Sequence, residues 1–174
     1  MRTLLTIICF ISFSSWGQTS KKLSDKFTLV TGRQYKGAIL SADQHTPKLD
    51  ETMTSRFTPT NNEVDKLEKE LERRIKEINK NRHGQGRHYG PKVDKHLRRY
   101  IRQYIGFIND KNEKVIYVGL HWKGRAHNWK NDFVMVFDGG SYHWSIEFNV
   151  DRDEFFQFGV NGIASVPNGS QQQL

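Results

Sequence analysis

Hydrophobic positions recur with helical spacing in one stretch of the chain. Between residues 64 and 78 they come at steps of three and four, and the positions between them are mostly Lys, Glu and Arg. This spacing places the apolar side chains on one face of a helix. Thr60 and Glu63 stand at capping-box spacing just before the first of them. The apolar face of the predicted helix consists of Val64, Leu67, Leu71, Ile75 and Ile78.

The second half of the chain has the patterns of β-strands. Turn-forming residues separate short segments rich in β-branched and aromatic side chains, and residues 142–150 alternate between apolar and polar. One interpretation stays open, because residues 93–105 also fit a helical face that ends at Gly106. The predicted strands are residues 100–108, 114–122, 132–137, 142–150 and 156–160.

These elements predict an α+β domain over residues 57–165. We expect one long amphipathic helix packed on a four- to five-stranded antiparallel meander, the layout of cystatin-like folds. Residues 18–56 are polar apart from a short apolar patch at 27–30, which predicts a partly disordered leader with one strand. Residues 166–174 are polar and predict a frayed tail. A fold of this kind does not by itself define a function.

The first 17 residues have the layout of a secretory signal peptide. Arg2 is followed by an apolar run at residues 4–13 and by the small residues Ser15 and Gly17, which predicts cleavage before Gln18. The run is too short to span a bilayer. The single cysteine, Cys9, lies inside this segment, so the mature chain is expected to be cysteine-free and without disulfides or thiol chemistry. We expect a secreted or periplasmic protein.

Positive charge is concentrated in one segment. The chain has 27 Lys and Arg against 19 Asp and Glu, and residues 80–102 hold eight cations with one acid. Cations interleaved with Tyr and His are typical of surfaces that bind anionic polymers, here an anionic polysaccharide or another polyanion. The alternative is a solvated segment whose charge prevents edge-to-edge aggregation. The candidate contact residues are Arg82, Arg87, Lys92, Lys95, Arg98, Arg99 and Arg102.

Three histidines form a weaker candidate site. His121 and His127 flank a loop, and His143 lies on a strand that we expect nearby. Three neutral imidazoles can bind zinc or copper. Their spacing matches no established ligand pattern, so hydrogen-bonded surface histidines are the alternative. The glycine-rich loop at 84–90 has Tyr89 where a dinucleotide-binding motif needs its third glycine, and we expect no cofactor.

Four short motifs resemble a family of small secreted bacterial proteins to which no activity is assigned. They are RQYIGF at residues 102–107, VIYVGLHW at 115–122, VFDGGSYHWSIEFN at 136–149 and VNGIA at 160–164. The resemblance covers roughly residues 57–165 and implies export and the helix-plus-meander layout. It implies no cofactor and no catalytic residue. Relatives in that family often carry cysteines near the positions of His121 and Tyr142, which this chain lacks.

The sequence therefore favours an exported, single-domain binding or interaction protein that contacts anionic polymers through its basic segment. It does not identify the ligand. Two alternatives remain. One is a small hydrolase-like or metal-dependent enzyme with a cleft near the histidines of the sheet. The other is a structural component of the cell envelope.

Overall fold

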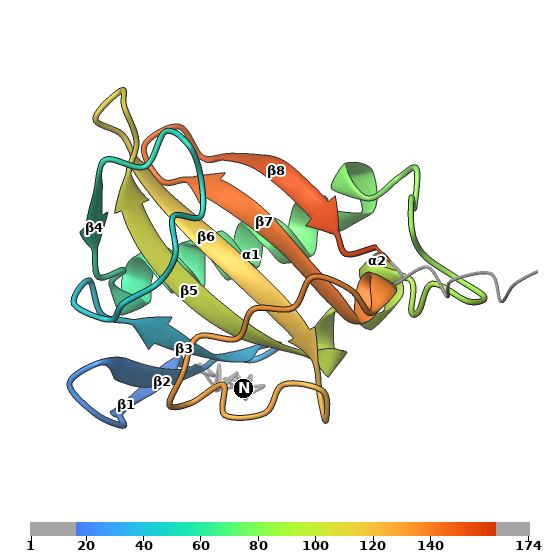
Figure 1. The fold of residues 1–174 in the computed structure, drawn as a ribbon, viewed down its shortest axis with the longest axis horizontal. Coiled ribbons are helices and arrows are strands. Elements are labelled where there is room, and N and C mark those ends of the chain that lie inside the picture. The colour runs from blue at the N-terminus through green and yellow to red at the C-terminus, as the bar shows by residue number, and fades with distance from the viewer. Residues whose placement is uncertain (1–16, 163–174) are drawn as a thin grey trace, which may run out of the picture.

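A large β-sheet forms the centre of the computed structural model, which describes residues 17–162. One long helix lies behind the sheet, and two long loops cross its front in Figure 1. The strands are β1 (Thr19–Lys22), β2 (Phe27–Thr31), β3 (Lys36–Leu40), β4 (Ser55–Phe57), β5 (Tyr100–Ile108), β6 (Lys114–Trp122), β7 (His143–Asn149) and β8 (Glu154–Val160). The helices are α1 (Asn61–Ile78) and α2 (Val93–His96), with 3-10 turns η1 (Leu97–Arg99) and η2 (Gly140–Tyr142).

The expected fold class is wrong. The sheet has eight strands in the order β1-β2-β3-β5-β6-β7-β8, with β4 added on β5, and helices make up only 19% of the structure. It is a mixed sheet rather than an antiparallel meander, because β3 runs parallel to β5. The extra strands come from the segment that the sequence predicts as a partly disordered leader. That segment joins the sheet because Phe27, Val30 and the run at 38–40 are all buried.

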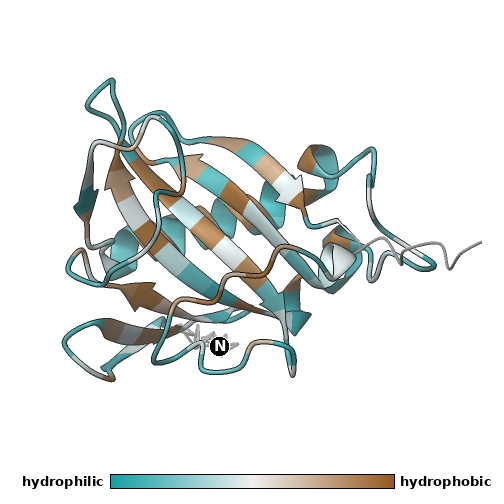
Figure 2. Cartoon of the chain, viewed as in Figure 1, coloured by the Kyte–Doolittle hydropathy of each residue, from teal (hydrophilic) through white to brown (hydrophobic). Residues whose placement is uncertain are grey.

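Helix α1 covers the back of the sheet. Its first turn is closed by a capping box, in which Thr60 accepts a hydrogen bond from the backbone of Glu63 and the Glu63 side chain accepts one from the backbone of Thr60. The apolar side chains of the helix are buried against alternate residues of the central strands. Figure 2 shows this alternation as brown and pale or teal bands along β5 to β8. The sheet contributes Tyr100, Tyr104, Ile116, Val118, Leu120, Trp144, Ile146 and Phe148 to this core.

The front of the sheet is covered by loops 41–54 and 123–139. A smaller apolar cluster around Leu40 and Ile105 lies beneath them. The prediction of a strand at residues 132–137 is wrong, because that segment has no regular secondary structure. Strand β6 pairs directly with β7, so no sheet edge is free for this segment between them. Its apolar residues cover the front face instead and form the brown stretch of loop in Figure 2.

The buried amide of Gln103 holds the second loop on the sheet. Its Nε2 donates to the carbonyl oxygens of Trp129 at 2.8 Å and Asp132 at 2.7 Å, and its Oε1 accepts from the backbone of Val134 at 2.8 Å. Three hydrogen bonds from one central strand thus satisfy backbone groups that have no strand partner.

The segment at 93–105, for which helix and strand were both open, contains both. Residues 93–99 form α2 and η1, and β5 begins at Tyr100. The predicted signal peptide and the predicted tail fall largely or entirely outside the described residues. Within residues 17–162, no helix is long and apolar enough to cross a membrane.

Candidate functional site

Arg102 is part of the core and not of the surface. Its side chain is fully buried, and its Nε lies 3.1 Å from Oε1 of Glu68 on α1. Tyr104 donates a hydrogen bond to the same carboxylate oxygen at 2.8 Å, and burial raises the pKa of Tyr104 well above its usual value. The expectation that Arg102 contacts a ligand polymer is therefore wrong. On β5 it points to the same side as Tyr100 and Tyr104, which places it under the helix.

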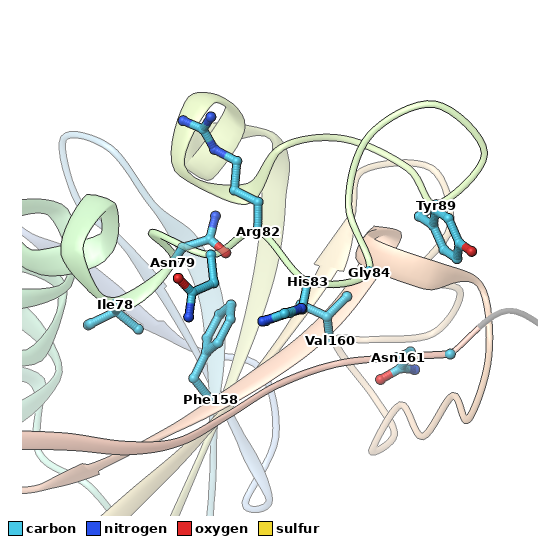
Figure 3. Close-up of a pocket in the computed structure, with 11 residues that line it drawn as sticks. Ile78, Asn79, Arg82, His83, Gly84, Tyr89, Phe158, Val160 and Asn161 are labelled. Carbon is cyan, nitrogen blue, oxygen red and sulfur yellow. The ribbon is translucent and has the colours of Figure 1, made fainter.

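Arg82 also has a partner within the protein, in a network of polar side chains that fixes the glycine-rich loop. It forms an ion pair of 2.9 Å with Asp94, which also accepts a hydrogen bond from Asn79. The loop borders a cavity of about 500 Å³ between the end of α1 and the end of β8. In Figure 3 the guanidinium of Arg82 points away from His83 and Phe158, which line that cavity. Arg82 is among the residues that line the cavity, but its guanidinium is held by Asp94.

Five of the candidate cations are exposed and form no ion pair within residues 17–162. Arg87 lies in the glycine-rich loop, which extends away from the sheet in Figure 1, and Lys92 precedes α2. Lys95, Arg98 and Arg99 lie together just before β5. The structure thus places three of the seven predicted residues in one short stretch at the end of the sheet.

Two cations that the sequence analysis missed join this stretch. The backbone of Lys123 donates to the carbonyl oxygen of Arg99 at 2.9 Å, which brings the loop after β6 beside η1. Arg99 lies over the ring of Trp122 at 5.3 Å from its centroid, and Arg125 lies over Tyr142 at 3.9 Å. The sequence feature that could have identified these two cations is the absence of Asp and Glu from residues 95–109 and 114–131. We call Lys95, Arg98, Arg99, Lys123 and Arg125 the cationic end of the sheet.

The aromatic rings at the cationic end touch one another. Trp122 meets Tyr142 edge to face at 5.7 Å and His96 at 6.0 Å between ring centroids. Both Trp122 and Tyr142 are half-buried, so part of each ring is accessible beside the arginines. Cations that stack on aromatic rings are held in place, which lowers the entropy lost when they bind a ligand.

The three candidate metal ligands do not converge. His121 and His143 are opposite each other on β6 and β7, with their Nδ1 atoms 3.0 Å apart, but His127 is exposed in the following loop. Within residues 17–162, no group of three or more His, Cys, Asp and Glu side chains is arranged to hold a metal ion. Burial, then the charge of the other imidazole, lowers the pKa of His121 to about 3, so His121 is neutral at physiological pH.

Polar residues next to this pair form a second site that the sequence analysis missed. Glu147 is only 4% exposed, and burial, helped by Asp50, raises its pKa to about 7. Tyr117 lies opposite it on β6. In the sequence, Glu147 belongs to the polar positions of the alternating segment 142–150, and such a pattern predicts a face exposed to solvent. The loops in front of the sheet bury it instead, so these groups line a cleft.

Comparison of the chain with protein-family models, curated proteins and solved structures finds no match in any of the three. The functional conclusions therefore depend on the geometry of the chain itself.

Proposed function

We propose that the protein binds anionic polymers, polysaccharides in particular, through the cationic end of its sheet. The observation that carries this proposal is the grouping of five exposed cations from two segments without any Asp or Glu. Cations left without acidic partners attract phosphate, sulfate or carboxylate groups, and binding releases the counterions of the polymer.

The aromatic rings add a second kind of contact. The accessible parts of Trp122 and Tyr142 offer flat apolar surface between the charged groups of Arg99 and Arg125. A charged sugar polymer has both anionic groups and apolar ring faces, so it can use both features. A short inorganic anion would use only the cations.

Export belongs to the same proposal. An apolar run of ten residues followed by small residues favours removal of residues 1–17, and a mature chain without cysteine suits either redox environment. The mass of the protein recovered from outside the cytosol tests this. A mass that starts at Gln18 agrees with export, and a full-length mass contradicts it.

The binding proposal is tested by retention on a sulfated-polysaccharide column in a salt gradient. We expect the wild type to elute well above about 0.15 M salt, the physiological value. The triple variant Lys95→Glu/Arg98→Glu/Arg99→Glu should elute near or below that value. Arg102 is excluded from the variant because its replacement would disturb the core.

A matched control makes the same change in net charge elsewhere. Lys21, Lys26 and Lys111 are exposed and form no ion pair within residues 17–162. Their triple replacement by Glu should lower the elution salt much less than the first variant does. If the two variants elute together, retention depends only on net charge, and the cationic end is not a binding site.

A further inference from the structure

Two cavities on the front of the sheet form one cleft. Their volumes are about 280 and 320 Å³, and they share four lining residues. Each volume is near the lower end of the range of about 300–1,000 Å³ usual for small-molecule sites. The floor comes from β6 and β7, and the walls come from the two loops that cross the front of the sheet. We call this the front cleft; the shared residues are Lys48, Leu49, Tyr117 and Ser145.

The floor of the front cleft follows from the strand register. His121 is opposite His143, Gly119 is opposite Ser145, and Tyr117 is opposite Glu147. Gly119 keeps the floor open, since a Cβ at this position would lie 3.2 Å from Nε2 of His121 and 3.4 Å from the ring of Tyr117. Two neighbouring central strands therefore present a compact group of polar side chains to one cleft.

Taken together, the polar groups on this floor both donate and accept hydrogen bonds. Because the two imidazoles share one proton between their Nδ1 atoms, one of the two Nε2 atoms is a donor and the other is an acceptor. Nε2 of His121 and Oε2 of Glu147 are buried and have no hydrogen-bond partner among the described residues. Buried polar atoms without a partner cost stability, so these two atoms favour a ligand that satisfies them.

Among the described residues, the one cation that lines the front cleft is Lys48, and the charge of Arg125 acts on His143 from nearby. Burial keeps His121 neutral, and it lowers the pKa of His143 as well. At the rim, Lys48 is paired with Glu51 at 3.3 Å. Asp50 accepts a hydrogen bond from the backbone of Thr52 at 2.7 Å and adds negative charge near Glu147. The negative charge of Asp50 beside Glu147 therefore favours a neutral ligand over a phosphate or carboxylate on this part of the floor.

The segment in front of the cleft adds exposed apolar surface. Phe137 is 85% exposed and Met135 is 43% exposed, and both line the cleft. Exposed apolar side chains that lie together beside a cleft are a common feature of ligand-binding surfaces. They provide a platform for the apolar face of a ligand whose polar groups reach the floor.

We propose that the front cleft binds a neutral, hydroxyl-rich ligand of the sugar class. Hydroxyl groups donate and accept, as the groups on the floor do, and the C–H face of a sugar ring fits the apolar side chains at the mouth. A purely apolar ligand would leave Nε2 of His121 and Oε2 of Glu147 without partners. This site is separate from the cationic end and does not depend on the polymer-binding proposal.

NMR of the side-chain nitrogens of His121 and His143 tests the proposal in the wild-type protein. The neutral probes are glucose, N-acetylglucosamine and their β-1,4-linked disaccharides, and the charged probes are glucuronate and glucose 6-phosphate. We expect at least one neutral probe to shift both imidazole signals with a dissociation constant on the order of millimolar, the range of weak small ligands. The charged probes should bind more weakly than glucose.

Variants separate the cleft from other surfaces. Ser145→Leu fills the floor and should weaken binding at least about tenfold, as expected when a pocket is occupied. Ser55→Leu, at the exposed first residue of β4, is the matched control and should bind as the wild type does. The cationic-end triple variant should bind the neutral probe unchanged.

Three results would overturn the proposal. One is that no probe shifts the imidazole signals of the folded wild type. Another is that a charged probe binds more tightly than glucose. The third is that the folded Ser145→Leu variant binds as tightly as the wild type. A loss of binding in Ser145→Leu counts as support only if circular dichroism shows the variant to be folded.

Discussion

Replacement of Arg102 by Met should destabilise the protein more than any replacement of an exposed cation. The side chain of Arg102 is fully buried, and it donates hydrogen bonds to Glu68 and to the backbone of Tyr100. Methionine has a similar length but cannot donate, so the carboxylate of Glu68 would remain buried with Tyr104 as its hydrogen-bond partner. The loss of one member of a buried ion pair leaves an uncompensated charge.

The magnitude follows from the contacts. Two hydrogen bonds involving a charged group are worth about 1.5–3 kcal/mol each, which gives roughly 3–6 kcal/mol. Buried ion pairs broken on one side cost about 3–5 kcal/mol, so we expect a decrease of about 4 kcal/mol in the free energy of unfolding. At about 2–4 °C per kcal/mol for a chain of this size, the melting temperature should fall by roughly 8–16 °C.

Urea unfolding followed by circular dichroism measures this change. Lys95→Met is the control, because Lys95 is exposed and unpaired within residues 17–162, and it should change stability by less than about 0.5 kcal/mol. The double variant Arg102→Met/Glu68→Leu should lose less than the sum of the two single variants, since it removes both charges. A loss below about 1 kcal/mol in Arg102→Met, or additivity in the double variant, would refute the reasoning.

Two further predictions concern the front of the sheet. The raised pKa of Glu147 means that the folded protein binds a proton that the unfolded chain releases, so stability should fall as the pH rises from about 4.5 to about 7. Urea midpoints across this range should show that Glu147→Gln removes this part of the pH dependence, whereas equal slopes would contradict the burial argument. Gln103→Leu breaks three hydrogen bonds to the loop at 129–134 and should cost about 2–3 kcal/mol. Amide exchange in that loop should increase, and unchanged exchange would show that the amide does not hold it.

The sequence pattern was sufficient where an element is specified locally. The helical spacing of residues 64–78 and its capping box need no partner to be recognised, and residues 142–150 alternate in the observed strand. The strands in residues 18–56 could not be predicted from such a local pattern. Strand β3 is a short apolar run, and its parallel pairing with β5 joins residues 65 positions apart. Long-range pairing of this kind leaves no local signal.

The candidate site residues also differ in whether a local sequence pattern could have indicated their role. Arg102 is one more cation in a basic run, and because residues 100–108 carry apolar side chains on both faces, the strand pattern alone did not show that Arg102 is buried under the helix. Glu68 is a charged residue within the apolar stripe of the helix, and this position was the sequence signal for a buried carboxylate that needs a cationic partner. The pair of His121 and His143 could not be assigned. The long loop between their strands leaves the register open, and the register decides that their rings meet.

The most direct test of polymer binding is an amide NMR titration of the folded protein with a short sulfated oligosaccharide. The account predicts shifts concentrated at residues 95–99, 122–127 and 142, with little change at the glycine-rich loop or in the front cleft. These shifts should disappear at high salt, because the contacts are electrostatic. Shifts spread over all exposed lysines and arginines, or concentrated at the glycine-rich loop, would contradict the assignment of the binding surface to the cationic end.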